Sequence, residues 1–133
     1  MTKVDKIRRK ERRADLKSKG RFLALPFNLI ESPAFMSLSK SAVQVFFAMY
    51  ARYNGKNNGQ IVASVRSLAK TSHLTRSATQ RAIVQLLERG FIIYTQKSWI
   101  NCKYKKASIY ALTTERIDGS PRLDKWKEWK APE

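Results

Sequence analysis

The stretch that decides the fold spans residues 64–94 and reads SVRSLAKTSHLTRSATQRAIVQLLERGFIIY. Ser64 and Thr75 have side chains suited to an N-cap, and apolar residues recur three and four positions apart after each of them. This pattern predicts one helix over residues 65–71 and a second over residues 76–89, which Gly90 ends. We therefore expect two helices that cross closely and are joined by a short turn.

The second of these helices has two chemically different faces. Its inward face is expected to hold Ala78, Thr79, Ala82, Ile83 and Leu86. The opposite face holds Ser77, Gln80, Arg81 and Val84, and Arg76 lies at the exposed start. An arginine can donate two hydrogen bonds to guanine, and a glutamine can pair with adenine in the same bidentate way. The outward face is therefore typical of a helix that enters the major groove of DNA.

A β-hairpin is predicted directly after these helices. Residues 91–95 have high β propensity, and residues 107–112 form their expected antiparallel partner. The loop between them is basic and carries Lys97, Lys103, Lys105 and Lys106. Trp99 also lies in this loop, and we expect it to pack beneath the loop rather than to project as a wedge. Lysines at such a tip are positioned to meet the phosphates of a nucleic acid.

The residues before this stretch predict a further helix and a first strand. Residues 22–38, here called the apolar segment, contain two prolines, so we expect an irregular chain that packs across the core with one short helical turn near Pro33. Ser39 is the expected N-cap of a helix that ends at Tyr53-Asn54-Gly55. Residues 60–63 are expected to form a short strand.

Both ends of the chain differ from residues 21–112, which we expect to form the folded domain. Residues 1–20 form a basic arm that is either flexible or a weak solvated helix. Its charge centres on Arg8, Arg9, Lys10, Arg12 and Arg13. Residues 113–133 contain Trp126 and Trp129 among lysines. Two tryptophans three positions apart would share one side of a helix, so we expect this tail to dock on the domain.

The charge of the chain is large and unevenly distributed. The chain has 133 residues and a formal net charge of +17. Residues 1–21 contain ten Lys and Arg against three Asp and Glu, and residues 22–112 contain twelve against two, whereas residues 113–133 are balanced. A positive field over the central residues favours nucleic acid, because neutralised phosphates release counterions. An anionic membrane is the competing partner, and it fits a charge spread over a folded domain less well.

The residue types that carry most enzyme chemistry are scarce. The chain has one cysteine, Cys102, and one histidine, His73, so it does not supply a Cys/His metal site or nucleophilic dyad. Residues 22–112 contain only Glu31 and Glu88 as acids, whereas a nuclease needs an acidic cluster to hold magnesium. No glycine-rich phosphate loop and no apolar run of about 20 residues is present. We expect no enzyme activity, metal, cofactor, small-molecule substrate or membrane partner, and a cytoplasmic location.

Short motifs across residues 20–130 resemble a known family. They include Gly20-Arg21-Phe22, Ser32-Pro33-Ala34-Phe35, Asn57-Asn58-Gly59, Glu88-Arg89-Gly90-Phe91-Ile92 and Leu112-Thr113. As a set, they are similar to a family of small bacterial phage and mobile-element proteins identified as winged helix-turn-helix proteins. The resemblance implies a mainly α fold with a small β-hairpin, of the α+β class, and DNA binding. The architecture is also similar to the winged-helix domains of plasmid replication initiators.

Together these observations predict a sequence-specific double-stranded DNA-binding protein that regulates transcription. The residues expected to contact the groove and the adjacent phosphates are Thr75, Arg76, Ser77, Gln80 and Arg81. The hairpin lysines hold flanking phosphates, and the basic arm adds sequence-independent affinity. Two alternatives stay open: an accessory DNA-binding factor in replication initiation or recombination, and a phage-encoded inhibitor of a host nucleoprotein complex. A palindromic target site would imply a homodimer.

Overall fold

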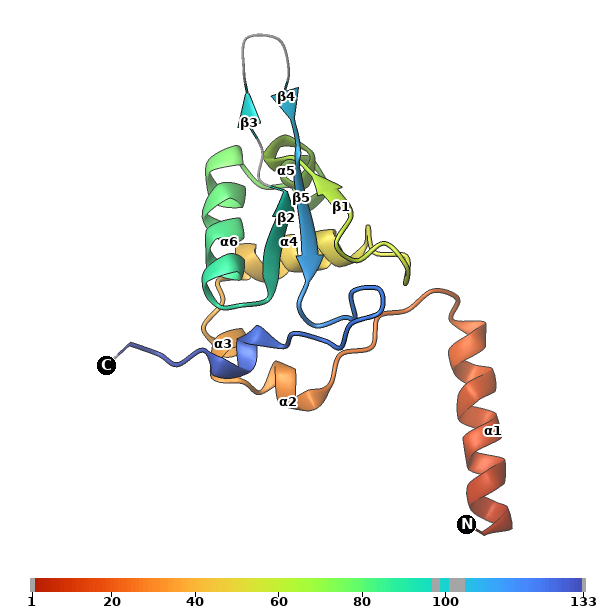
Figure 1. Cartoon of the computed structure of the whole chain (residues 1–133). Helices are drawn as coiled ribbons and strands as arrows, with labels where there is room; N and C mark the ends of the chain where they lie inside the picture. Colours follow the sequence, from red (N-terminus) through yellow and green to blue (C-terminus); the bar gives the residue numbers. More distant parts are fainter. Residues whose placement is uncertain (1, 97–98, 101–104, 133) are drawn as a thin grey trace.

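The computed structural model describes residues 2–96, 99–100 and 105–132. Helices combine with small antiparallel sheets, which confirms the predicted α+β class (Figure 1). The helices are α1 (Lys3–Ser18), α2 (Phe27–Ile30), α3 (Pro33–Met36), α4 (Lys40–Tyr50), α5 (Val65–Ser72), α6 (Arg76–Glu88) and the short 3-10 helix η1 (Lys125–Glu128). The strands are β1 (Ile61–Ala63), β2 (Ile92–Gln96), β3 (Trp99–Ile100), β4 (Lys105–Lys106) and β5 (Ser108–Leu112).

The predicted N-caps begin α4, α5 and α6. Ser39, Ser64 and Thr75 each accept a hydrogen bond at the side-chain oxygen from the backbone amide three residues later, at 3.1, 3.0 and 3.1 Å. These three helices pack against one another. The side-chain oxygen of Gln85 also accepts a hydrogen bond of 3.1 Å from the Ser39 amide, which ties α6 to the start of α4. The helices α5 and α6 are the two that the sequence predicts, and a short turn joins them, so this prediction is confirmed.

A three-stranded antiparallel sheet in the order β1-β5-β2 packs beside these helices. The strands β2 and β5 are the predicted arms of the hairpin, and β1 is the predicted first strand. The pairing of β2 with β5 is irregular between Tyr94 and Gln96. Beyond this point β3 and β4 form a separate ladder that continues the hairpin away from the domain (Figure 1). An irregularity of this kind bends a hairpin and increases its twist.

One apolar core connects the helices, the sheet and the C-terminal tail. Phe91 is fully buried in this core. Trp126 of η1 is 4% exposed and stacks on Phe91, with ring centroids 6.4 Å apart. Trp129 is partly buried, and the Arg89 guanidinium lies 5.0 Å from the centre of its ring. The tail therefore docks on the domain through both tryptophans.

The helix that begins at Lys40 is shorter than its sequence predicts. It ends at Tyr50, so the predicted end at Tyr53-Asn54-Gly55 is wrong. The amide of Ala51 still bonds the Phe47 carbonyl, whereas the next two amides bond carbonyls only three residues back, which closes the helix. Gly55, with a φ of +92°, lies in the following loop. It serves a turn in which the Asn54 side chain accepts hydrogen bonds from two backbone amides, at 2.8 and 3.0 Å.

The apolar segment contains two short helices, α2 and α3, where one helical turn was expected. Pro26 immediately precedes α2, and Pro33 is the first residue of α3. Because the first amides of a helix have no partner within it, a proline at this position loses no hydrogen bond. Ser32 caps α3 by accepting a hydrogen bond of 3.2 Å from the Phe35 amide. The prolines that exclude one long helix therefore begin two short ones.

The side chain of Asn58 ties the loop before β1 to the end of β5. Its amide nitrogen donates to the Leu112 carbonyl at 2.8 Å, and its oxygen accepts from the Leu112 amide at 2.7 Å. These two bonds replace the ladder bonds that a neighbouring strand would supply there. Because Asn58 is 6% exposed, water has little access to the groups that it satisfies.

Replacing Asn58 with alanine is expected to lower the free energy of unfolding by about 1–3 kcal/mol, because it leaves the buried amide of Leu112 without a partner and removes the shorter of two hydrogen bonds to the Leu112 carbonyl. Urea denaturation followed by circular dichroism measures this loss. The matched control is Asn54→Ala, which removes an exposed asparagine of the same loop and should cost clearly less. Equal losses in the two variants would contradict this role for Asn58.

Candidate nucleic-acid interface

Three residues, His73 to Thr75, connect α5 to α6. His73 has φ 56° and ψ 41°, a left-handed conformation that turns the chain sharply after α5. The Leu74 amide donates to the Ala69 carbonyl at 3.0 Å, and the Leu74 side chain packs against the core. The turn therefore holds α6 in a fixed orientation relative to α5.

The outward face of α6 is exposed as its spacing predicts. The residues predicted to contact DNA from this helix are all exposed: Thr75, Arg76, Ser77, Gln80 and Arg81. The Thr75 oxygen accepts its capping bond of 3.1 Å from the Ala78 amide, so its O–H stays available as a donor. Over the part of the chain that the structure describes, the side chains of Arg76, Gln80 and Arg81 have no hydrogen bond or ion pair. Their donors are free to bind another molecule.

The charge on α6 changes along its length. Arg76 and Arg81 lie in its first half, together with the unpaired amides and the positive end of the helix dipole. Glu88 lies at its last position, and its carboxylate pairs with Arg89 at 3.8 Å. The beginning of α6 therefore attracts anions, whereas its end carries an acid whose charge is paired with Arg89.

The hairpin projects from the end of the domain at which α6 begins (Figure 1). Within it, β3 and β4 pair Trp99 with Lys106 and Ile100 with Lys105, so two of the four predicted lysines lie on this ladder. The other two, Lys97 and Lys103, lie outside the described residues, as does the predicted packing of the Trp99 side chain. The fold thus brings β4 and the start of α6 to the same end of the molecule.

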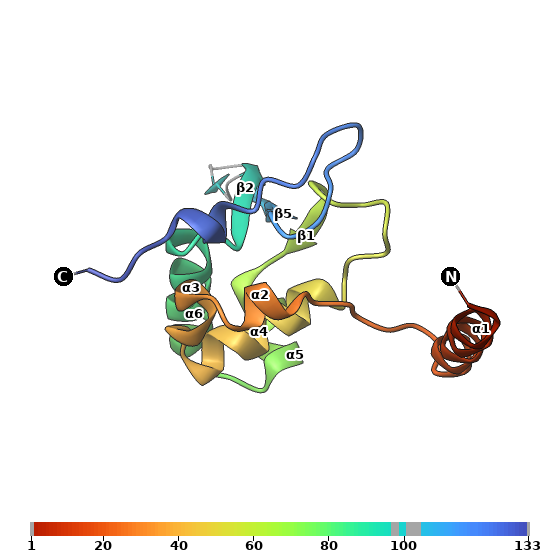
Figure 2. The ribbon, with the colours of Figure 1, turned by 90° about the horizontal axis from the view of Figure 1, so that it is seen from below.

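The basic arm forms α1, a helix without a buried residue. Thr2 caps it by accepting a hydrogen bond of 3.2 Å from the Asp5 amide. The Thr2 hydroxyl donates to the Asp5 carboxylate in return, and this bond holds the pKa of that carboxyl below its usual value. Of the two states expected for the arm, the structure contains the solvated helix. In Figures 1 and 2, α1 stands apart from both α6 and the hairpin, so the arm residues Arg8, Arg9, Lys10, Arg12 and Arg13 do not join the α6 face.

The structure also exposes residues on or near this face that the sequence analysis does not name as DNA contacts. Arg66 and Lys70 are exposed on α5, and their spacing of four places them on one side of that helix. Val84 lies on α6 beyond Gln80 and Arg81 and is 56% exposed. An exposed valine can contact the methyl group of thymine. Helical spacing alone placed Val84 outward, but an apolar side chain gives no charge signal that would mark it as a contact.

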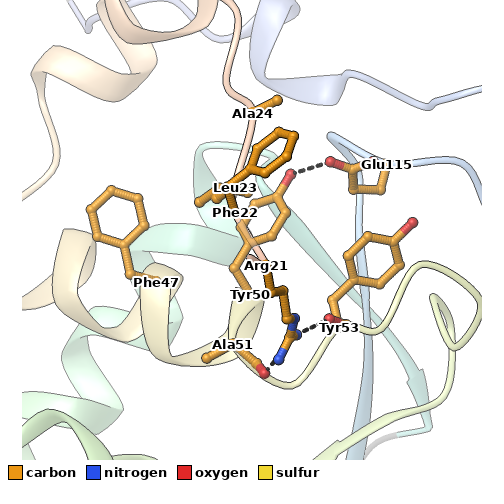
Figure 3. A pocket seen from close by; sticks show the side chains of 9 residues that line it. All are labelled: Arg21, Phe22, Leu23, Ala24, Phe47, Tyr50, Ala51, Tyr53 and Glu115. Carbon is orange, nitrogen blue, oxygen red and sulfur yellow. Dashed lines mark hydrogen bonds between the residues drawn. The ribbon is translucent and has the colours of Figure 1, made fainter. Parts of the chain in front are cut away.

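A pocket of about 380 Å³ lies between the apolar segment and the end of α4 (Figure 3). The Arg21 guanidinium donates to the carbonyls of Ala51, at 3.0 Å, and Tyr53. The Tyr50 hydroxyl donates to the Glu115 carboxylate at 2.8 Å, and burial raises the pKa of Tyr50, so it stays protonated. The polar groups of this pocket therefore form hydrogen bonds within the same chain. These bonds fix the point at which the basic arm leaves the domain.

In residues 2–96, 99–100 and 105–132, no group of three or more His, Cys, Asp or Glu side chains could hold a metal ion. None of the described helices has the length and apolar character needed to cross a membrane. Comparison with protein-family models, curated proteins and solved structures finds no match for this chain.

Proposed function

We propose that this chain is a winged helix-turn-helix protein that binds double-stranded DNA at specific sites and regulates transcription in a phage or mobile element. The exposed face of α6 supports this function most directly. Arg76, Gln80 and Arg81 lie there without an intramolecular partner among the described residues, at the end of the domain from which the hairpin projects. The net charge of +17 adds a general attraction to DNA.

In the proposed complex, the first half of α6 enters the major groove, which at about 12 Å wide admits one helix. Arg76 and Arg81 each donate two hydrogen bonds to guanine, and Gln80 pairs with adenine. The hydroxyls of Thr75 and Ser77, with the free amides at the helix start, donate to phosphate oxygens. Because the opposite face of α6 is buried against α4 and α5, the base-contacting side chains project from a rigid support.

The hairpin and α5 supply further affinity in this proposal. Lys105 and Lys106 of β4 neutralise phosphates that flank the site, and Arg66 and Lys70 do the same from α5. Each phosphate contact contributes about 0.9 to the slope of log affinity against log salt concentration. The basic arm adds sequence-independent affinity through the same counterion release.

Selection of bound sites from a random duplex pool tests the proposed function. We expect a recurring motif to be enriched, because bidentate base contacts favour one base pair over the others by about 1–3 kcal/mol each. Two half-sites about one helical turn apart would show that the chain binds as a homodimer. Retention of duplex without an enriched motif would contradict sequence specificity. Failure to retain any duplex would contradict DNA binding and favour the inhibitor of a nucleoprotein complex.

A further inference from the structure

The cationic residues of α1 are not distributed evenly around the helix. Five of them lie three and four residues apart and therefore follow one face, here called the α1 stripe: Lys6, Arg9, Lys10, Arg13 and Lys17. The stripe extends over roughly 16 Å along the helix axis at about 1.5 Å per residue. This length is similar to the major-groove width of about 12 Å, so a helix with this stripe can reach phosphates on both sides of a groove.

The acidic residues of α1 leave this stripe uncompensated. Asp5 is engaged by the Thr2 cap, and Asp15 pairs with Lys19 at 3.9 Å. The stripe itself has no ion pair among the residues that the structure describes. By the same spacing, Arg8 and Arg12 lie on the side of the helix that holds Asp5 and Asp15. The five predicted arm residues therefore divide into two groups with different surroundings.

The attachment of α1 places the stripe away from the α6 face. Arg21 binds the carbonyls of Ala51 and Tyr53, so the arm starts at the C-terminal end of α4 (Figure 3). Both views of the chain place α1 beyond that end of α4, on the side away from α6 (Figures 1 and 2). Gly20, with a φ of +74°, lies in the link between α1 and Arg21, and its amide donates to the Lys17 carbonyl at 3.2 Å. The root of α1 therefore stays on the far side of the domain from α6.

We propose that the α1 stripe is a second nucleic-acid-binding surface, so that one molecule holds two separate duplex segments, one on α6 and one on α1. This inference rests on the proposed function of α6. The second surface is sequence-independent, because lysine and arginine side chains along one helix face contact phosphates rather than base edges. An anionic membrane is a less suitable occupant, because Glu11 interrupts the apolar side of α1 between Ile7 and Ala14.

A bridging assay with the full chain tests this proposal. One duplex that carries the selected site is immobilised on beads, and a second, fluorescent duplex of random sequence is free in solution. The stripe variant Arg9→Gln with Arg13→Gln is compared with the control Arg8→Gln with Arg12→Gln. Both variants remove two positive charges from exposed positions of the same helix. We expect several-fold lower capture of the fluorescent duplex by the stripe variant, and a clearly smaller loss by the control, because Arg8 and Arg12 lie on the other side of the helix and contribute only their general charge.

The possible failures of this assay have different meanings. Equal loss in the two variants, or wild-type protein that binds the beads without capturing fluorescent duplex, would overturn the proposal and leave the function of α6 intact. Capture by the stripe variant equal to that by the wild type would also overturn it and indicate bridging by a homodimer. If the stripe variant lost the wild-type binding to phosphatidylserine vesicles but captured as much DNA as the wild type, the α1 stripe would be a membrane surface instead. Wild-type protein that binds no duplex in a mobility shift would overturn both proposals.

Discussion

Replacing Arg76 and Gln80 together with alanine is expected to cost about 1–3 kcal/mol for each lost base contact on the selected site. On random duplex the same variant should lose little affinity, because the proposed phosphate contacts of the hairpin, α5 and basic arm remain. Both side chains are exposed and unpaired in the described structure, so their removal should leave the fold intact. Quantitative mobility shifts on the two duplexes, with denaturation midpoints measured in parallel, separate binding from stability.

A matched control for this variant replaces Gln60 and Arg116 with alanine. These residues are also exposed, but they lie in loops away from α6. The control removes the same two side-chain types and the same charge, so it should weaken binding only slightly and equally on both duplexes. If the α6 variant lost equal affinity on the selected and random duplexes, α6 would not be the helix that recognises the sequence.

Replacing Gly90 with alanine is expected to lower the free energy of unfolding by about 2–5 kcal/mol. Gly90 has a φ of +84°, a left-handed conformation that costs a non-glycine residue about 1–2 kcal/mol. In addition, an added Cβ would lie 2.7 Å from the backbone carbonyl carbon of Lys125. Because backbone cannot rotate away as a side chain can, η1 must shift, and overpacking of this kind costs about 1–3 kcal/mol. Thermal and urea unfolding measure the loss.

The variant Gly55→Ala separates the conformational cost from the cost of contact with η1. Gly55 has a φ of +92°, but no atom lies within 4 Å of the position of an added Cβ. This variant should therefore show only the conformational cost, about 1–2 kcal/mol. Near-ultraviolet circular dichroism should also change in Gly90→Ala, because displacement of η1 moves Trp126 away from Phe91. Equal destabilisation by both substitutions would show that contact with η1 contributes nothing.

The parts of the fold that the sequence predicts correctly depend on neighbouring residues. Ser39, Ser64 and Thr75 cap their helices through bonds to amides three residues away, so the relevant partners lie within one helical turn. The exposure of Gln80 and Arg81 follows from helical spacing, because one face of α6 must be buried. Local patterns of this kind can be recognised in the sequence before the tertiary structure is known.

The features that the sequence does not predict depend on contacts between residues far apart in the chain. The pairing of Asn58 with Leu112 spans 54 positions, and no local pattern distinguishes Asn58 from the asparagines beside it. The early end of α4 leaves Tyr53 free to accept from Arg21, a contact over 32 positions. The separation of the basic arm from α6 follows from that contact. Charge composition predicts that both surfaces are cationic, but it contains no information on which side of the domain each one lies.

The way the tail closes the core determines how far the polypeptide can be shortened. The Thr113 amide donates to the Phe91 carbonyl at 2.9 Å, and the Thr113 carbonyl accepts from Asp124 at 2.8 Å, just before Trp126 covers Phe91. Proteolytic trimming at residue 112 would uncover an aromatic ring and leave the Phe91 carbonyl without its amide partner. A minimal fragment for crystallisation or nuclear magnetic resonance should therefore extend through the second tryptophan of the tail, whereas the first twenty residues can be removed without opening the hydrophobic interior.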